Sequence, residues 1–246
     1  MEFSIDRDIF LKSLGHANGI IEKKTTLPIL SNILIETKQS KIKITATDLD
    51  IIYFEEVSPQ DIKKEGSTTT SASVLYDILR KLQPGAKVEL ILINENKLKL
   101  VSGNSKFNLL CMPPDNFPLS KEDNENKNFE ILPQKLLKLL NKTKISISND
   151  ETRHYLNGIF LHLTEAHGRN FLTGVATDSH RLSSSSLEVD KMNDFTSIIL
   201  PRKTVFQLCS LLNEAKDPLI MQTSDNKIKF TLGSIKLISK VILPQN

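Results

Sequence analysis

The sequence predicts an α+β protein that contains two copies of one domain, and two observations support this prediction. The first is an internal repeat. Residues 89–103 resemble residues 219–233 at an offset of 130, and Ala46–Asp48 matches Ala176–Asp178 at the same offset. The second is the order of patterns, because helical and alternating apolar stretches follow one another in the same order in both halves. A repeat of this length indicates paired domains, since solenoid units have about 20–50 residues.

Each half is expected to open with a short strand and a helix. In the first half the strand is expected at Glu2–Ile5 and the helix from about Arg7 to Ala17, with Asp6 as its N-cap. The counterparts in the second half are a strand at Asn128–Leu132 and a helix at about Pro133–Lys144, where Pro133 suits the first turn.

The remaining elements are expected in the same order in both halves. Two β-rich runs come next, at Ile29–Glu36 and Lys41–Ala46 and then at Gly158–Leu163 and Phe171–Ala176. Second helices follow at Ser73–Leu82 and Pro201–Leu212. Hairpins close the halves, at Lys87–Ile93 with Lys97–Val101 and at Leu219–Gln222 with Lys227–Thr231. Helices beside antiparallel strands define the α+β class.

A polar stretch with no apolar residue, Ser120–Lys127, separates the halves and is typical of an interdomain connection. The expected organisation of the 246 residues is therefore a first domain at 1–120, a linker at 121–127 and a second domain at 128–246.

Composition excludes several classes of protein. No run of about 20 apolar residues is present and the N-terminus lacks a signal-peptide pattern, so we expect a cytoplasmic protein with no membrane span. Cys111 and Cys209 lie in apolar contexts and are expected to be buried thiols. The net charge of +3 is uneven: basic and acidic residues are 16 and 16 in residues 1–122, but 16 and 11 in residues 127–246.

Basic helix faces are the main functional signal in the residues themselves. Lys135, Lys138 and Lys142 follow helical spacing opposite Leu136, Leu137 and Leu140, and no acid occurs from Gln134 to Asn149. Arg202 and Lys203 begin the next helix, where cations oppose the helix dipole. Lys12 and Arg80 give a weaker signal in the first half. These faces are either solvated surface or contacts for nucleic-acid phosphates.

No catalytic, metal or cofactor motif is present, so no catalytic residue, metal or cofactor is expected. Asp178 and His180 with Ser183–Ser186 offer a hydrolase triad as an alternative. That reading is disfavoured because an Asp and a His two residues apart cannot easily form the relay.

Several motifs resemble the bacterial DNA polymerase III β subunit, the sliding-clamp family. They are TLPILSNILIE (Thr26–Glu36), ATDLD (Ala46–Asp50), FPLS (Phe117–Ser120), ETRHYLNGIFL (Glu151–Leu161), ATDSHRL (Ala176–Leu182) and LPRK (Leu200–Lys203). The resemblance implies the DNA-clamp fold, in which two inner helices per domain pack against outer antiparallel sheets. It also implies a ring that encircles duplex DNA as the processivity factor of the replicative polymerase and has no active site.

The resemblance implies two sets of site residues. DNA contacts would be Lys12, Lys24, Arg80, Lys135, Lys138, Lys142, His154, Tyr155, Arg202 and Lys203. A pocket for partner peptides would use Arg153, Leu156, Thr177, His180, Arg181 and Leu182. The implied partners are duplex DNA, the DNA polymerase III α subunit, the clamp loader and other proteins with a clamp-binding motif.

The chain departs from the family pattern in three places. Ser179 replaces a glycine, Asp150 stands where a polar DNA contact is expected, and neither a third domain nor an FPDY-like segment follows Ile242. The resemblance implies a homodimeric ring for the full-length family, and a monomer is the alternative for this chain. The alternatives are a truncated clamp that only docks partners and a two-domain clamp that closes as a trimer.

Overall fold

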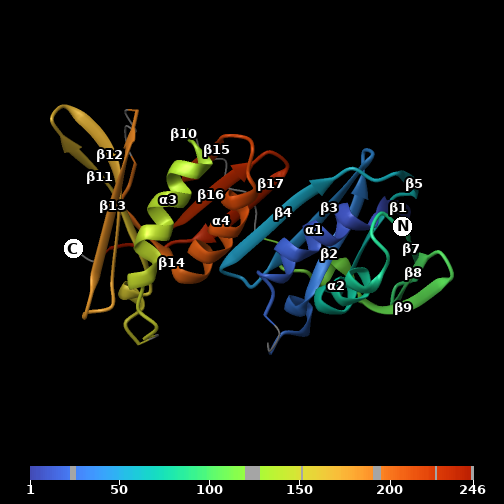
Figure 1. The fold of residues 1–246 in the computed structure, drawn as a ribbon. Helices are drawn as coiled ribbons and strands as arrows, with labels where there is room; N and C mark the ends of the chain where they lie inside the picture. The colour runs from blue at the N-terminus through green and yellow to red at the C-terminus, as the bar shows by residue number, and fades with distance from the viewer. Residues whose placement is uncertain (23–25, 120–127, 151, 191–194, 225, 245–246) are drawn as a thin grey trace. The chain divides into compact units, whose positions relative to one another are not determined.

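The computed structural model describes residues 1–22, 26–119, 128–150, 152–190, 195–224 and 226–244. These residues form two compact units, Met1–Lys121 and Glu122–Asn246. Each unit contains helices and antiparallel strands, which confirms the α+β class (Figure 1).

Unit 1 contains two antiparallel sheets and two helices. One sheet has the order β4 (Ile51–Val57), β3 (Lys41–Thr47), β2 (Asn32–Lys38), β6 (Gly66–Ser71). The other has the order β9 (Ser105–Met112), β8 (Lys97–Ser102), β7 (Lys87–Asn94), β1 (Glu2–Asp6), β5 (Asp61–Lys64). A short β6–β9 pairing joins the sheets. The helices α1 (Arg7–Asn18) and α2 (Ala72–Lys81) pack against each other.

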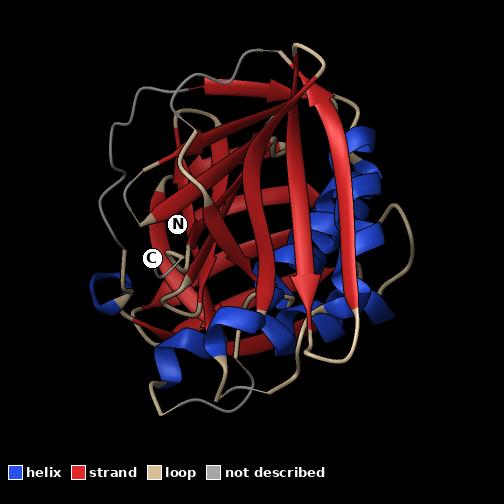
Figure 2. Cartoon of the chain, turned by 90° about the vertical axis from the view of Figure 1, so that its left-hand side faces the viewer, coloured by secondary structure: helices blue, strands red, loops and turns tan. Residues whose placement is uncertain are grey.

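Unit 2 repeats this arrangement. Its first sheet has the order β13 (Leu182–Val189), β12 (Arg169–Thr177), β11 (Gly158–Ala166), β14 (Ile198–Pro201). Its second has the order β10 (Asn128–Ile131), β15 (Leu219–Thr223), β16 (Lys227–Leu232), β17 (Ile235–Lys240). The helices α3 (Pro133–Thr143) and α4 (Arg202–Glu214) pack together. Helix α3 also packs against β12 and β13 of the first sheet, and Figure 2 shows helices beside the strands.

The strand registers confirm the internal repeat. Leu34 pairs with Thr45 in unit 1, and the residues at the corresponding positions of unit 2, Phe160 and Val175, pair in the same way. The β3–β4 hairpin of unit 1 and the β12–β13 hairpin of unit 2 correspond as well. Thr47 lies opposite Ile52 in the first, and Thr177 lies opposite Leu182 in the second.

The first helix of each unit begins as the sequence predicts. Asp6 caps α1, because its carboxylate accepts hydrogen bonds from the backbone N–H groups of Asp8 at 2.8 Å and Ile9 at 3.2 Å. Pro133 occupies the first turn of α3, where its missing N–H costs no helical hydrogen bond.

The leucine face of α3 is wider than the sequence analysis expects. Leu136, Leu137 and Leu140 are buried, and so is Leu139. The reason is Gly174 in β12: a Cβ atom there would lie only 2.6 Å from Leu139 Cδ2. The helix therefore approaches the sheet closely enough to cover a fourth leucine, and each buried leucine contributes roughly 1.5–3 kcal/mol.

Several strands were missed by the apolar patterns. They are β4, β5, β6, β9, β13, β14 and β17. The run Ser183–Ser186, which the sequence analysis considers only as part of a possible triad, lies inside β13. β13 is an edge strand that pairs with β12 along its whole length. Backbone hydrogen bonds to β12 therefore make it a strand, although its side chains show no apolar pattern.

A buried polar cluster joins α1 to β4 in unit 1. The Tyr53 hydroxyl donates to the Glu55 carboxylate, and His16 Nδ1 lies 3.9 Å from Glu55 Oε2. Burial raises the pKa of Glu55, but the hydrogen bonds and charge of His16 and the Tyr53 hydroxyl outweigh it, so the pKa lies below its ordinary value. Glu55 is therefore ionised at neutral pH although it is buried.

Replacing Gly158 by alanine is expected to destabilise unit 2. A Cβ at this position would lie 2.4 Å from the Leu200 carbonyl oxygen of the paired strand β14, so the backbone would have to move. We expect a loss of about 1–3 kcal/mol in the free energy of unfolding, measured by urea denaturation. Gly15→Ala is the control, because its Cβ would meet Tyr76 at an ordinary 3.7 Å. It should stabilise α1 by about 0.5–1 kcal/mol. Equal effects of the two changes would contradict the packing argument.

Replacing Glu55 by glutamine should lower stability at neutral pH by about 1.5–3 kcal/mol, because hydrogen bonds to the charged carboxylate are lost. A carboxylate with a lowered folded pKa stabilises the protein fully above its unfolded pKa of about 4.3. This contribution disappears as the pH falls through the folded pKa. Unfolding free energies of wild type and variant should therefore converge in acid. The exposed neighbour Glu56→Gln is the control and should show no such convergence.

Candidate partner pocket and basic helix faces

Unit 2 contains a pocket with a volume of about 340 Å³, which falls in the range of small-ligand sites. It is formed where the 3-10 helix η4 (His154–Leu156) meets the sheet. Its lining is mainly apolar and comes from η4, β11, β12, β14 and the segment after β17: Tyr155, Leu156, Gly158, Phe160, Val175, Ala176, Thr177, Ile199 and Pro244. The pocket can therefore take an apolar side chain.

Two of the six residues proposed for a peptide pocket, Leu156 and Thr177, line this cavity. Tyr155, which the resemblance assigned to DNA, lines it as well. The remaining lining residues were not found from the motifs. A signal was available for Phe160, because it stands between the core residues Ile159 and Leu161 in a strand that is apolar on both faces.

The other four proposed pocket residues lie outside the lining. Arg153 Nε donates to Asp150 Oδ2 at 2.8 Å, and Arg181 Nε donates to Asp178 Oδ2 at 2.9 Å. His180 is exposed in the turn between β12 and β13. Leu182 starts β13 and is 66% exposed, and Val175, Ala176 and Ile199 form the sheet side of the cavity. A contact between Leu182 and a bound peptide therefore stays a prediction.

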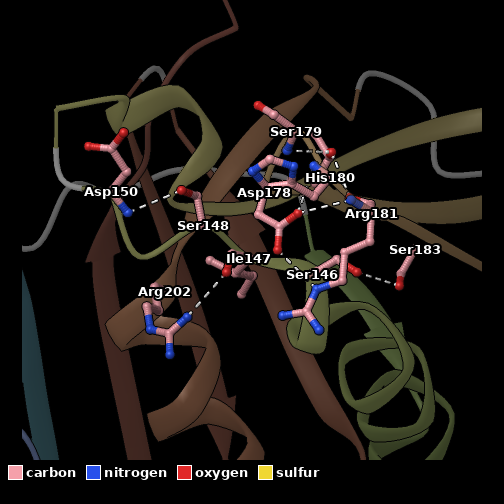
Figure 3. A network of polar contacts seen from close by, with 11 residues as sticks. Ser146, Ile147, Ser148, Asp150, Asp178, Ser179, His180, Arg181, Ser183 and Arg202 are labelled. Carbon is pink, nitrogen blue, oxygen red and sulfur yellow. Dashed lines mark hydrogen bonds and ion pairs between the residues drawn. The ribbon is translucent and has the colours of Figure 1, made fainter.

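The repeated Thr-Asp motif builds a turn. Asp178 Oδ1 accepts from the backbone N–H groups of His180 and Arg181, both at 3.0 Å (Figure 3). Thr177 Oγ1 donates to the Arg181 carbonyl at 2.8 Å. In unit 1, Asp48 and Thr47 make the corresponding bonds. The repeated residues are thus explained by turn geometry in both units.

The same turn removes the basis for a hydrolase triad. The backbone hydrogen bonds from Arg181 and His180 hold the pKa of Asp178 below its ordinary value. The carboxylate faces the backbone of the turn and the Arg181 guanidinium, and Ser183 pairs instead with Ser146, with 2.6 Å between the two hydroxyl oxygens (Figure 3). Asp178 therefore has a structural role in the turn.

Most positions of unit 1 that correspond to the pocket lining are buried, although Ile29, the counterpart of Tyr155, is only half-buried. The buried ones are Leu30, Asn32, Leu34, Thr45, Ala46, Thr47 and Thr69. Asn32 of unit 1 corresponds to Gly158, and Thr69 corresponds to Ile199. The Asn32 side-chain Nδ2 donates to Thr69 Oγ1 at 3.1 Å. Leu34, Thr45 and Thr47 are thus buried in unit 1, whereas their counterparts Phe160, Val175 and Thr177 are half-buried around the pocket of unit 2.

The basic face of α3 is exposed as the spacing predicts. Lys135, Lys138 and Lys142 are all exposed on the side opposite the buried leucines. At the packed neighbour α4, the half-buried Arg202 places its guanidinium carbon 5.0 Å from the centre of the Phe206 ring. Lys144 Nζ lies 5.4 Å from the same ring centre. Phe206 thus holds two cations near α4 by cation–π contacts.

The other predicted DNA contacts are distributed over both units. In unit 1, Lys12 is exposed on α1 and Arg80 forms an ion pair with Asp77 at 3.4 Å. In unit 2, His154 and Tyr155 are exposed with their rings in edge contact, and Lys203 is half-buried. Lys24 lies outside the described residues.

No group of three or more His, Cys, Asp or Glu residues is placed to hold a metal ion within the described part of the chain. No helix among the described segments is long and apolar enough to cross a membrane.

Comparison with known proteins identifies relatives over nearly the whole sequence. Residues 1–121 match the family model for the N-terminal domain of the DNA polymerase III β subunit, and residues 130–244 match the model for its central domain. The chain is 36% identical over 244 residues to a β sliding clamp of Caulobacter vibrioides, and 33% identical over 243 residues to that of Escherichia coli K12. These alignments cover 98% of the chain and 65% of each relative.

A solved structure shows the same fold. A sliding clamp from Bartonella birtlesii, bound to griselimycin, superposes with a TM-score of 0.95 at 37% identity. The match covers 100% of this chain and 66% of that one. The chain thus spans about two thirds of the length of the proteins it resembles.

Proposed function

The chain belongs to the DNA polymerase III β subunit family, and we propose that it acts as a DNA sliding clamp. In this role it encircles duplex DNA as the processivity factor of the replicative polymerase and catalyses no reaction itself. The observation that carries the proposal is the acid-free row of exposed lysines on α3, Lys135, Lys138 and Lys142.

The lysine row suits contact with a sliding duplex. Phosphate contacts supply affinity without reading sequence. A row of cations along a helix can contact several of the regularly spaced phosphates of the DNA backbone. Lys12 on α1 occupies the position that Lys138 occupies on α3. Both units therefore present a cation from the corresponding helix, which is what a symmetric ring around DNA requires. A net charge of only +3 is compatible with weak, mobile contacts.

The pocket of unit 2 is the proposed docking site for partner peptides. Its lining of Leu156, Phe160, Val175 and Ile199 suits an apolar anchor side chain. The proposed occupants are peptides of the polymerase α subunit, the clamp loader and other clamp-binding proteins. That a related clamp from Bartonella birtlesii was solved bound to griselimycin supports a ligand-binding role for this fold.

Ring closure is a separate part of the proposal. Relatives are longer, since the chain covers 65% of their length, and the family resemblance implies a homodimer. The alternative is that these 246 residues dock peptides without closing a ring. Sedimentation analysis separates the two: a closed dimer or trimer gives a multiple of 27.7 kDa, and a monomer gives that mass itself.

Changing Lys135, Lys138 and Lys142 together to Glu should abolish most duplex binding, because the phosphate contacts are lost. The slope of log affinity against log salt should fall by about 0.9 for each contact removed. Fluorescence anisotropy with a labelled duplex measures both quantities. The matched control changes Lys97, Lys99 and Lys106, on β8 and β9, to Glu. If both triple variants lose binding equally, net charge rather than the α3 face determines the affinity.

Replacing Leu156 by Ala should weaken peptide docking about 5- to 30-fold, since truncation removes roughly 1–2 kcal/mol of apolar contact. The probe is a fluorescent, amidated synthetic hexapeptide that contains a Leu-Phe pair. Leu110→Ala is the control, because Leu110 is 86% exposed on β9 of unit 1 and lies outside the lining. A loss of affinity in the control that equals the loss in Leu156→Ala would rule out this pocket as the docking site.

A further inference from the structure

Two loops flank the pocket and meet through one arginine. The first loop leads into η4 and carries Asp150 and Arg153 just before the lining residues Tyr155 and Leu156. The second is the β12–β13 turn, which carries Ser179 just after the lining residue Thr177. Arg153 Nη1 donates to Ser179 Oγ at 2.8 Å and so connects the two loops beside the pocket.

Asp150 fixes the other side of the same guanidinium. Its Oδ2 atom accepts from Arg153 Nε at 2.8 Å, while Oδ1 accepts from the backbone N–H and hydroxyl of Thr152. Bonds from Thr152 and Arg153 hold the pKa of Asp150 below its ordinary value, so the carboxylate is ionised at neutral pH. Because a guanidinium is planar and its donors point in fixed directions, bonds at Nε and Nη1 together define its orientation.

The Ser179 contact is specific to unit 2. Ser179 has a positive φ of 76°, and its counterpart Leu49 in unit 1 has a φ of 80°. The left-handed conformation therefore belongs to the turn in both units. A leucine has no hydroxyl to accept a hydrogen bond, so the contact that Ser179 makes has no equivalent at Leu49. Asp150 and Ser179 thus contact Arg153 from two different loops.

Building on the peptide docking proposed above, we infer that Asp150 and Ser179 make Arg153 a specificity-determining bridge at the pocket. The bridge positions η4 against the β12–β13 turn. It also places a carboxylate on the arginine that would otherwise attract acidic residues of a partner peptide. The second arginine nearby, Arg181, is compensated in the same way by Asp178 at 2.9 Å. The site therefore selects partner peptides by their apolar anchors, with little preference for an acid next to them.

The test compares two labelled hexapeptides that share a Leu-Phe pair and differ only in whether Asp or Asn precedes it. Wild type should bind both with similar affinity. Asp150→Asn keeps an acceptor for Thr152 but releases the charge of Arg153. It should therefore favour the Asp peptide by about two- to five-fold, in the range of an exposed ion pair. This gain should vanish in high salt and in the double variant Asp150→Asn, Arg153→Gln.

Ser179→Gly tests the other end of the bridge. It should weaken both peptides by a similar factor, because the two loops lose their connection, while leaving their ratio near one. Leu49→Gly is the matched control, since it changes a residue of the same conformation in unit 1 without a contact to Arg153. It should leave both affinities unchanged.

The outcomes separate this inference from the docking proposal. If folded wild type binds neither peptide, peptide docking itself is refuted. If wild type binds both but Asp150→Asn shows no new preference for the Asp peptide, Asp150 does not prevent Arg153 from attracting acidic peptides, and the inference fails. If Ser179→Gly and Leu49→Gly behave alike, the hydroxyl bridge has no role in docking.

Discussion

Burial of the α3 leucine face is the constraint on which the charged surface of unit 2 depends. Four leucines, Leu136, Leu137, Leu139 and Leu140, must leave water together, and the glycine at position 174 lets the helix approach β12 closely enough to allow this. Once that face is buried, helical spacing leaves Lys135, Lys138 and Lys142 no direction except outward. The positive row is thus a geometric result of core packing, and mutual repulsion among the lysines is the small cost of the arrangement.

Comparison of the two units separates residues that build the fold from residues that define a site. Thr47 with Asp48, and Thr177 with Asp178, close the same turn with the same hydrogen bonds. Their repetition reflects backbone geometry, which both copies need. The residues that differ between copies are informative in another way. Gly158 in place of Asn32 keeps a β11 side chain out of the space beside β14, and Ser179 in place of Leu49 adds an acceptor for Arg153.

Helices and paired hairpins could be predicted from the sequence because their signals are local. The leucine spacing of α3 and the capping by Asp6 need only neighbouring residues. The β13 strand could not be found in the same way, since its serines carry no apolar alternation and its identity comes from pairing with β12. The pocket was only partly foreseen, because Phe160, Ile199 and Pro244 come from three segments that only the folded chain brings together. Motifs located Leu156 and Thr177, but they carry no information on exposure and so did not distinguish these lining residues from the exposed Leu182.

The asymmetry between the two copies has a consequence for ligand stoichiometry. A duplicated domain would ordinarily offer two equivalent receptors, but Leu34, Thr45 and Thr47 are buried in unit 1, whereas their counterparts in unit 2 are half-buried and line the pocket. A small molecule that fits the open cavity should therefore saturate at one equivalent per polypeptide.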